Sequence, residues 1–259
     1  MEHIVNLWDG PAPFSDQCGD QAQPSLASYP LEDARGAVIV IPGGGYTHKA
    51  EHEAHQIARM LNSQGIASYV LDYRVYPCPH EAPFADARRA IRLVRSMGYE
   101  KVGVLGFSAG GHLCCDTAVH FDGGNPESDD PVERFSSRPD AFVPCYAVIT
   151  MGKYTHKGSR KALLQQEWEN EALIQFYSNE LQVRMDTPPA FIWHTAEDQA
   201  VPVQNSLMLA FALSEKKIPY EMHIYPKGHH GLGLAQEYSL VAGWSNACCR
   251  WLLEMGFGK

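Results

Sequence analysis

The sequence predicts an α/β protein in which a mostly parallel central sheet carries helices on both faces. Apolar, β-branched runs of strand length alternate with stretches of helical apolar period along the 259 residues. Such alternation is typical of parallel strands joined by right-handed crossovers. The composition, 45% hydrophobic and 20% charged, is that of a globular protein. The length suits one large domain, so we expect a single domain over residues 1–259.

Apolar runs bounded by turn-forming residues predict six strands. They cover Ala37–Ile41, Ile66–Leu71, Lys101–Phe107, Ala141–Thr150, Ala190–Thr195 and Glu221–Tyr225. In sheets of this kind the chemistry gathers at the carboxyl ends of the strands. Functional residues are therefore expected in the loops that follow these runs.

Two apolar stripes predict amphipathic helices between strands. One consists of Phe84, Ala87, Ile91 and Val94, and the other of Val203, Leu207, Ala210 and Phe211. The charged residues left to the other faces of the first helix are Asp86, Arg88, Arg89, Arg92 and Arg95. We interpret the arginines as a solvated helix face and not as a phosphate site.

Two segments interrupt the alternation of strands and helices. Residues 122–140 are polar and rich in turn-forming types, and residues 151–186 carry a short helical patch, Lys161–Tyr177. We interpret residues 151–186, called the insertion below, as a small addition to the domain that overhangs the site.

Charge and hydropathy exclude several classes of partner. Lys and Arg number 21 against 30 Asp and Glu, a net charge of −9, which gives no electrostatic footprint for nucleic acid or an anionic membrane. The first ten residues have neither a basic start nor a long apolar core, so no secretory signal is expected. The longest apolar run, Ala37–Ile41, is far shorter than the roughly 20 residues of a membrane helix. We expect a cytoplasmic protein without nucleic-acid or membrane partners, and self-association stays open.

The seven cysteines form no C-x-x-C pattern. Two pairs, Cys114-Cys115 and Cys248-Cys249, are adjacent in stretches of helical pattern, where neighbouring side chains point apart. We expect buried free thiols in a reducing compartment.

The strongest motif is Gly106-Phe107-Ser108-Ala109-Gly110-Gly111, which follows one predicted strand and opens a helical stretch, Gly111–Val119. This is the context of a G-x-S-x-G nucleophile elbow, in which the serine occupies a strained strand-to-helix turn. Side chains two residues on either side of Ser108 would clash in so tight a turn. The helix amino terminus would supply a positive dipole and free amides to a developing oxyanion.

A second glycine-rich loop, Pro42-Gly43-Gly44-Gly45-Tyr46, directly follows Ala37–Ile41. Its glycines allow backbone amides to approach a reacting carbonyl, so Gly44, Gly45 and the amide of Ala109 are the expected oxyanion hole. A dinucleotide site is the rival interpretation, with Asp72 as the ribose acid. In that pattern, however, His48 stands where the third glycine belongs.

A nucleophilic serine needs a base, and the base needs an orienting carboxylate. Glu197 and Asp198 follow the strand Ala190–Thr195, and His229 and His230 follow Glu221–Tyr225. The order serine, acid, histidine is the order that hydrolases of this architecture use. The residues alone leave open which acid and which histidine serve.

With these motifs the chain resembles the α/β-hydrolases, and within them the small carbohydrate acetylesterases and the bifunctional feruloyl/acetyl esterases. The matching stretches are Leu7-Trp8, Pro42 to Tyr46, His52-Glu53, Asp72-Tyr73-Arg74, Gly106 to Leu113, Thr187-Pro188-Pro189, His194 to Pro202 and His230 to Ala235. The resemblance implies that Asp198, three residues before Val201-Pro202, is the acid. It also implies that His230, directly before a glycine, is the base, with His229 at the site entrance.

Other polar residues near these motifs have plainer interpretations. The residues His48, His52 and His55, with Glu51 and Glu53, suggest a metal site, but a polar face after the oxyanion loop explains them, and no metal or cofactor is expected. His112 and His194 are expected as buried structural residues. Tyr46 either shapes the substrate pocket or packs in the core.

The combined expectation is a serine ester hydrolase acting through Ser108, His230 and Asp198. The resemblance implies short acyl groups, most of all acetyl on a sugar or oligosaccharide. The alternatives are a general short-chain carboxylesterase, a feruloyl esterase or a small-amide hydrolase. From another class, a non-catalytic ligand receptor on the same scaffold remains, and a nicotinamide oxidoreductase is a distant third.

Overall fold

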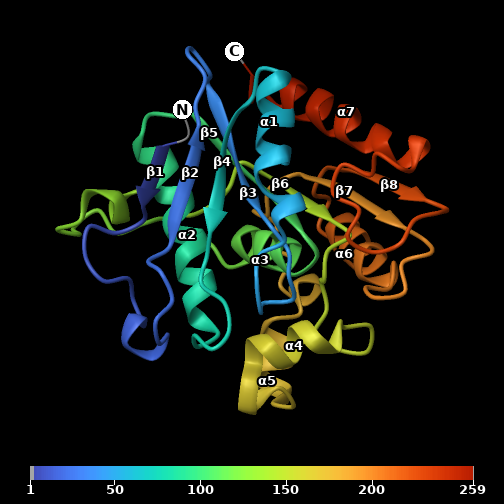
Figure 1. Cartoon of the computed structure of the whole chain (residues 1–259), viewed down its shortest axis with the longest axis horizontal. Helices are drawn as coiled ribbons and strands as arrows, with labels where there is room; N and C mark the ends of the chain where they lie inside the picture. The colour runs from blue at the N-terminus through green and yellow to red at the C-terminus, as the bar shows by residue number, and fades with distance from the viewer. Residues whose placement is uncertain (1–2, 259) are drawn as a thin grey trace.

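A mixed sheet runs through the whole fold (Figure 1). The computed structural model describes residues 3–258, and Met1, Glu2 and Lys259 lie outside the described residues. The strands are β1 His3–Asn6, β2 Ser25–Tyr29, β3 Gly36–Ile41, β4 Ala67–Asp72, β5 Lys101–Phe107, β6 Ala141–Cys145, β7 Ala190–Thr195 and β8 Tyr220–Tyr225. Over this described range they form one sheet in the order β1-β2-β4-β3-β5-β6-β7-β8.

The six neighbouring strands β4, β3, β5, β6, β7 and β8 are parallel to one another. The strands β1 and β2 join the sheet in antiparallel pairs. In the parallel part, Ile41 pairs with Gly106, Phe107 with Cys145, and Thr195 with Tyr225. These pairings bring the carboxyl ends of the strands to one edge of the sheet. The loops that carry the predicted site therefore leave the sheet side by side.

Helices cover both faces of the sheet (Figure 1). They are α1 His55–Ser63, α2 Glu81–Ser96, α3 Ser108–Val119, α4 Lys157–Leu164, α5 Glu171–Phe176, α6 Gln204–Glu215 and α7 Ser239–Glu254. Single turns lie at η1 Ser15–Gln17, η2 Glu51–Glu53, η3 Pro131–Arg134, η4 Gln165–Glu167 and η5 Asn179–Leu181. The helices α2, α3 and α6 share one apolar cluster with the sheet, and α1 and α7 share the other.

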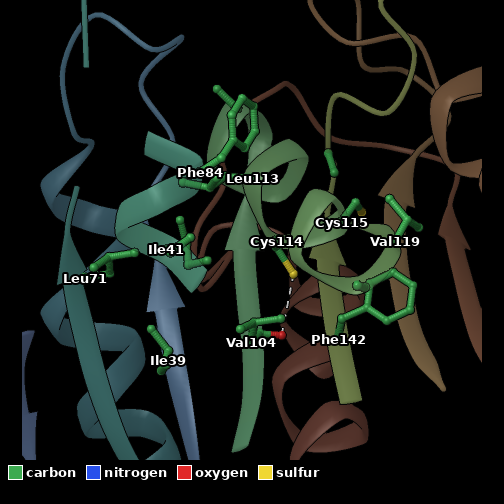
Figure 2. Packing of buried hydrophobic residues seen from close by; sticks show 14 of the residues in the cluster. Ile39, Ile41, Leu71, Phe84, Val104, Leu113, Cys114, Cys115, Val119 and Phe142 are labelled. Atoms are coloured by element: carbon green, nitrogen blue, oxygen red, sulfur yellow. Dashed lines mark hydrogen bonds between the residues drawn. The ribbon is translucent and has the colours of Figure 1, made fainter. Parts of the chain in front are cut away.

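Helix α3 lies deepest in the first cluster. Figure 2 shows Leu113, Cys114 and Cys115 of this helix above Val104 of β5 and Phe142 of β6. The Cys114 thiol donates to the Val104 carbonyl over 3.5 Å. All twelve residues of α3 are buried. The helix that begins at Ser108 is thus held on all sides, which fixes the position of its first residue.

The expected fold class is confirmed, with differences in single elements. Five of the six predicted strands match to within one residue at either end. The other one, predicted as Ala141–Thr150, stops at Cys145. Tyr146, at a φ of 34°, turns the chain out of the sheet. The strands β1 and β2 were not predicted, because β1 is largely exposed and neither segment has a clear apolar alternation.

The second predicted apolar stripe is wrong for two of its members, although Ala210 is buried as predicted. Leu207 is 48% exposed and Phe211 is 69% exposed, whereas Leu209 and Leu213 are the buried leucines of α6. The helix is apolar on several sides, so the sequence pattern did not select the core face. Its outer side lines a cavity of about 620 Å³ together with Leu181 and Val183 of the insertion.

The prediction that the arginines of α2 form a solvated face is wrong. Arg89 binds Asp130 and Glu133 over 2.7 and 2.8 Å, and Arg92 binds Asp122. The further pairs are Arg95 with Asp140, Arg88 with Asp116, and the buried Asp86 with Arg74. The polar segment 122–140 supplies most of these acids, so its charge serves to hold it against α2.

The prediction of seven free thiols is wrong for two of them. Cys18 and Cys78 form a disulfide that joins the loop after η1 to the loop before α2. They are 60 residues apart in sequence, and the fold brings their Cα atoms to 4.3 Å. The other five cysteines are free and buried. Within residues 3–258 no helix is long and apolar enough to cross a membrane.

Candidate active site

Ser108 occupies a sharp turn between β5 and α3. Its φ of 51° lies in the left-handed region, which is costly for a residue with a side chain. Phe107 ends the strand in extended conformation, and α3 starts at Ser108 itself. The serine is 7% exposed. The turn therefore places its hydroxyl at the carboxyl edge of the sheet, at the amino terminus of a buried helix.

The glycines around Ser108 are required by close backbone approach. A Cβ on Gly106 would lie 2.2 Å from the Gly110 carbonyl oxygen, and one on Gly110 would lie 2.3 Å from the carbonyl oxygens of Ile41 and Pro42. A Cβ on Gly111 would lie 2.5 Å from the Ala147 Cβ. Every one of these distances is too short for a carbon atom, so no other residue fits without moving the backbone.

The structure brings Ser108, His230 and Asp198 together from three loops. The Ser108 Oγ lies 2.7 Å from His230 Nε2, and His230 Nδ1 lies 2.6 Å from Asp198 Oδ2. A carboxylate can only accept, so Nδ1 carries the proton and Nε2 accepts from the Ser108 hydroxyl. This is the protonation state in which an imidazole can remove a proton from serine.

Asp198 is held as a carboxylate by its surroundings. Burial alone raises the pKa of Asp198, but hydrogen bonds from His194 and His230 and from the Val201 amide lower it well below its ordinary value. The amides of Ala200 and Val201 both donate to Oδ1 over 2.9 Å. An ionised Asp198 stabilises positive charge on His230.

The neighbouring acid and histidine point elsewhere. Glu197 is exposed and accepts from the Gly228 amide and from Lys227. His229 lines a separate hollow, which shares His52 and Gly231 with the pocket around Ser108, and its ring lies edge-on to that of Tyr238.

The glycine-rich loop after β3 lies beside Ser108. Gly44 and Gly45 have φ values of 121° and 65°. A Cβ on Gly44 would lie 2.1 Å from the His48 carbonyl oxygen, so the turn requires a glycine. Within residues 3–258 the amides of Gly44, Gly45 and Ala109 make no hydrogen bond with another group of the protein. These three donors remain available to an oxyanion.

A buried carboxylate that the sequence analysis did not assign to the site supports this loop. Glu53 is 2% exposed, and its Oε2 accepts from the Gly43 amide over 2.8 Å. Its Oε1 accepts from the Tyr146 hydroxyl over 2.6 Å, and that hydroxyl oxygen accepts from the Gly233 amide over 2.9 Å. The Tyr146 ring lies edge-on to His230 at 5.1 Å. Glu53 therefore links the oxyanion loop to the loop of the triad histidine.

A pocket of about 360 Å³ opens above Ser108. It is lined by Gly44, Gly45, Thr47, His48, Ala50, His52, Glu53, Ser108, His156, Gly158, His230 and Gly231. His156 and Gly158 come from the insertion, so this segment forms part of the pocket wall. The position of His156 was missed, because no pattern in the sequence singles it out.

Tyr46 does not reach this pocket, so of the two roles considered for it, core packing is correct. It is 1% exposed, and its hydroxyl lies 2.8 Å from His112 Nδ1. His112 Nε2 donates to the Tyr177 carbonyl over 2.7 Å, so Nδ1 accepts from Tyr46. His112 is buried, as expected, and it joins the oxyanion loop to the insertion.

His194 is buried, as expected, but it also contacts the triad acid. Its Nε2 donates to the Val201 carbonyl over 2.9 Å and lies 3.4 Å from Asp198 Oδ2.

The histidines and acids at 48–55 do not form a metal-binding cluster. Within residues 3–258 no three His, Cys, Asp or Glu side chains come together as a metal site.

A serine, a histidine and a carboxylate in this hydrogen-bonded order, at the carboxyl edge of a mostly parallel sheet, define the α/β-hydrolase class. Comparison with known proteins agrees with the class. Residues 29–213 match the model of the BD-FAE family, and the chain belongs to that family.

Relatives with this sequence pattern carry esterase and xylanase names. The chain is 40% identical to endo-1,4-beta-xylanase B of Butyrivibrio fibrisolvens over 86% of its length and 36% of that protein. It is 32% identical to an acetylxylan esterase of Xylanibacter ruminicola over 85% of its length and 46% of that protein. The chain thus spans less than half the length of these two relatives.

A solved structure is similar over nearly its full length. The acetyl ester-xyloside bifunctional hydrolase from Caldicellulosiruptor lactoaceticus superposes with a TM-score of 0.91 at 43% identity, covering 99% of this chain and 97% of that one. The carboxylesterase Cest-2923 from Lactobacillus plantarum, at 23% identity and a TM-score of 0.75, shares the fold.

Proposed function

We propose that this chain is a serine ester hydrolase that removes short acyl groups, acetyl above all, from sugars or oligosaccharides through an acyl-enzyme. The observation that carries the proposal is the unbroken hydrogen-bonded series from Ser108 through His230 to Asp198. It lies beside three backbone amides that have no partner in the described protein. Nucleophile, base, orienting acid and oxyanion donors are the complete set that acyl transfer needs.

In the first half of the reaction, His230 Nε2 takes the hydroxyl proton as the Ser108 Oγ attacks the ester carbonyl carbon. Asp198 stabilises the imidazolium that forms, and the amides of Gly44, Gly45 and Ala109 bind the oxyanion. His230 then protonates the leaving alcohol, and the acyl group stays on Ser108. Each oxyanion donor of this kind contributes about 10²–10³ in turnover.

Water completes the cycle by the same route. His230 removes a proton from the water as it attacks the acyl-enzyme carbonyl, and the same amides bind the second oxyanion. The tetrahedral intermediate collapses to the carboxylic acid when His230 returns the proton to Ser108.

The pocket supports a small acyl group and a polar alcohol. Its volume of about 360 Å³ is near the lower end for ligand sites. Among the described residues that line it there is no Leu, Ile, Val, Met, Phe, Tyr or Trp side chain. A feruloyl or long-chain acyl group would bind better against aromatic or aliphatic walls. The names of the xylan-related relatives point the same way, towards acetylated xylan fragments.

The test is an acyl-chain profile on p-nitrophenyl esters from acetate to octanoate, with Ser108→Ala beside the wild type. We expect kcat/KM to fall steeply beyond acetate and the variant to lose turnover by on the order of 10⁶-fold. A flat or rising profile would favour a general carboxylesterase. Equal rates for the wild type and Ser108→Ala would exclude Ser108 as the nucleophile, and silence of the wild type on every ester would favour a receptor or an amidase.

A further inference from the structure

The insertion contributes one histidine to the wall of the catalytic pocket. His156 and Gly158, at the start of α4, line the pocket together with Ser108 and His230. The same turn of chain lies against the oxyanion loop: the Ser159 Oγ is 3.9 Å from the place where a Cβ on Gly45 would be. An imidazole at this place faces whatever ester Ser108 attacks.

The hydrogen bonds of His156 fix which nitrogen carries its proton. The Ser159 amide donates to Nδ1 over 3.2 Å, and the Ser159 Oγ lies 2.8 Å from the same atom. A backbone amide can only donate, so Nδ1 is unprotonated and caps α4. Burial lowers the pKa of His156, and the nearby His230 lowers it further, while Asp198 opposes them. The ring is therefore neutral near pH 7, with its proton on Nε2.

That proton has no acceptor in the protein. Within residues 3–258 no hydrogen bond uses His156 Nε2, and the side chain is half-buried. His156 Nε2 is not one of the enclosed unpaired atoms of residues 3–258, so it can reach solvent, and a ligand oxygen bound there would take the place of water. The capping bond to Ser159 also keeps the ring from rotating freely. The pocket wall thus carries a fixed, neutral donor in addition to the oxyanion amides.

The place of His156 indicates which half of the ester it meets. In the proposed reaction the carbonyl oxygen goes to Gly44, Gly45 and Ala109, and the leaving oxygen faces His230. His156 lines the same pocket as His230, which the leaving oxygen faces, and the charges of His230 and Asp198 both act on its ring. The ring is therefore within the region from which the alcohol half departs.

We infer that His156 Nε2–H donates to an oxygen of the alcohol half of the substrate, a hydroxyl or ring oxygen of a sugar, and so favours sugar acetates over simple aryl acetates. This rests on the proposed ester hydrolysis. Such a donor can form a hydrogen bond with a polyol, whose oxygens lie close to the ester. It can form none with a nitrophenyl ring, whose carbon atoms occupy the same region.

The test separates substrate binding from helix capping. In His156→Asn the shorter amide oxygen can still accept from the Ser159 amide, because asparagine is a good capping residue, but Nε2–H is gone. The readout is the ratio of kcat/KM for acetylated xylobiose to kcat/KM for p-nitrophenyl acetate. We expect His156→Asn to lower this ratio about tenfold, the worth of one neutral hydrogen bond, mainly through KM for the sugar ester.

The matched control is Lys157→Ala, an exposed neighbour in the same helix that does not line the pocket. It should leave the ratio as in the wild type. An unchanged ratio in His156→Asn, or an equal loss on both esters, would overturn the inference while the ester hydrolase stands. A wild type inactive on both esters would instead overturn the proposed function, and the inference with it.

Discussion

The loops around Ser108 and the insertion supply two walls of one pocket, and these walls are built by different means. Around Ser108 the backbone segments touch, so that Gly44, Gly106 and Gly110 have no room for a Cβ. The insertion consists of short helices that pack apolar side chains such as Leu163 and Leu164 into the core and are also tied by side-chain hydrogen bonds, such as that of Ser178 Oγ with the Met151 amide over 2.9 Å. The catalytic wall is set by steric exclusion, and the recognition wall by individual side chains. We therefore expect substitutions in the insertion to change substrate preference without disturbing the chemistry.

The largest expected effect comes from filling the space under the nucleophile. In Gly110→Ala the new methyl would lie 2.3 Å from two backbone oxygens, those of Ile41 and Pro42, which cannot move as a side chain could. We expect a loss of about 3 kcal/mol in the free energy of unfolding, together with most of the esterase activity. Urea unfolding and p-nitrophenyl acetate turnover measure the two.

The control for Gly110→Ala is a glycine with open space around it. Gly243 lies exposed within α7, and a Cβ there would meet nothing within 4 Å. We expect Gly243→Ala to stabilise the protein by about 0.5–1 kcal/mol, because alanine lowers the conformational entropy of the unfolded chain and has the higher helix propensity. If the two variants behaved alike, steric exclusion would not be what shapes the catalytic wall.

A smaller effect is expected from the carboxylate that supports the oxyanion loop. Glu53→Gln keeps an oxygen for the Gly43 amide, but its NH₂ then faces the Tyr146 hydroxyl, whose proton loses its acceptor. Since Glu53 holds the loop and touches no substrate atom in the proposed reaction, kcat should fall about tenfold with little change in KM. Glu51→Gln, two residues away and exposed, is the matched control and should match the wild type. A KM effect of Glu53→Gln without a kcat effect would contradict this positioning role.

The same contrast explains what the sequence could predict. The predicted triad residues come together in the structure because each directly follows a strand or lies in a glycine-rich turn, and both features are local patterns. Glu53 bonds to Tyr146 across 93 residues, and Cys18 to Cys78 across 60. The local sequence does not predict such long-range partners. His156 was not predicted for the same reason, since its role depends on where the insertion lies.

The misassigned elements of the fold follow from ambiguous patterns. Helix α6 is apolar on several sides, so Leu207 and Phe211 appeared as good a core stripe as Leu209 and Leu213. The α2 arginines looked solvated because their acids, Asp122, Asp130, Glu133 and Asp140, lie in a segment without regular period. The regular apolar period of the sequence predicted the six strands β3 to β8. It could not predict the ion pairs that a segment without regular period makes with α2.

The smallest expected effect tests a buried side chain that joins the oxyanion loop to the insertion, His112. Burial lowers the pKa of His112 below its ordinary 6.5, although the Tyr177 carbonyl and Asp116 oppose this. The folded protein therefore binds fewer protons than the unfolded chain below pH 6.5.

The stability that His112 contributes is fully present above that pH and is lost as the pH falls towards the folded-state pKa. We expect the free energy of unfolding to decline as the pH falls below about 6.5, by less than about 1.4 kcal/mol per pH unit for this group. The carboxylates with lowered pKa act only near and below their ordinary values of 3.8 for aspartate and 4.5 for glutamate; they are Asp116, Asp122, Asp130, Glu197 and Asp198. Urea unfolding across this range should give a flatter pH dependence for His112→Gln, which keeps polar atoms for Tyr46 and Tyr177 but does not titrate. Equal slopes in the wild type and the variant would show that His112 does not couple protonation to the joining of the oxyanion loop and the insertion.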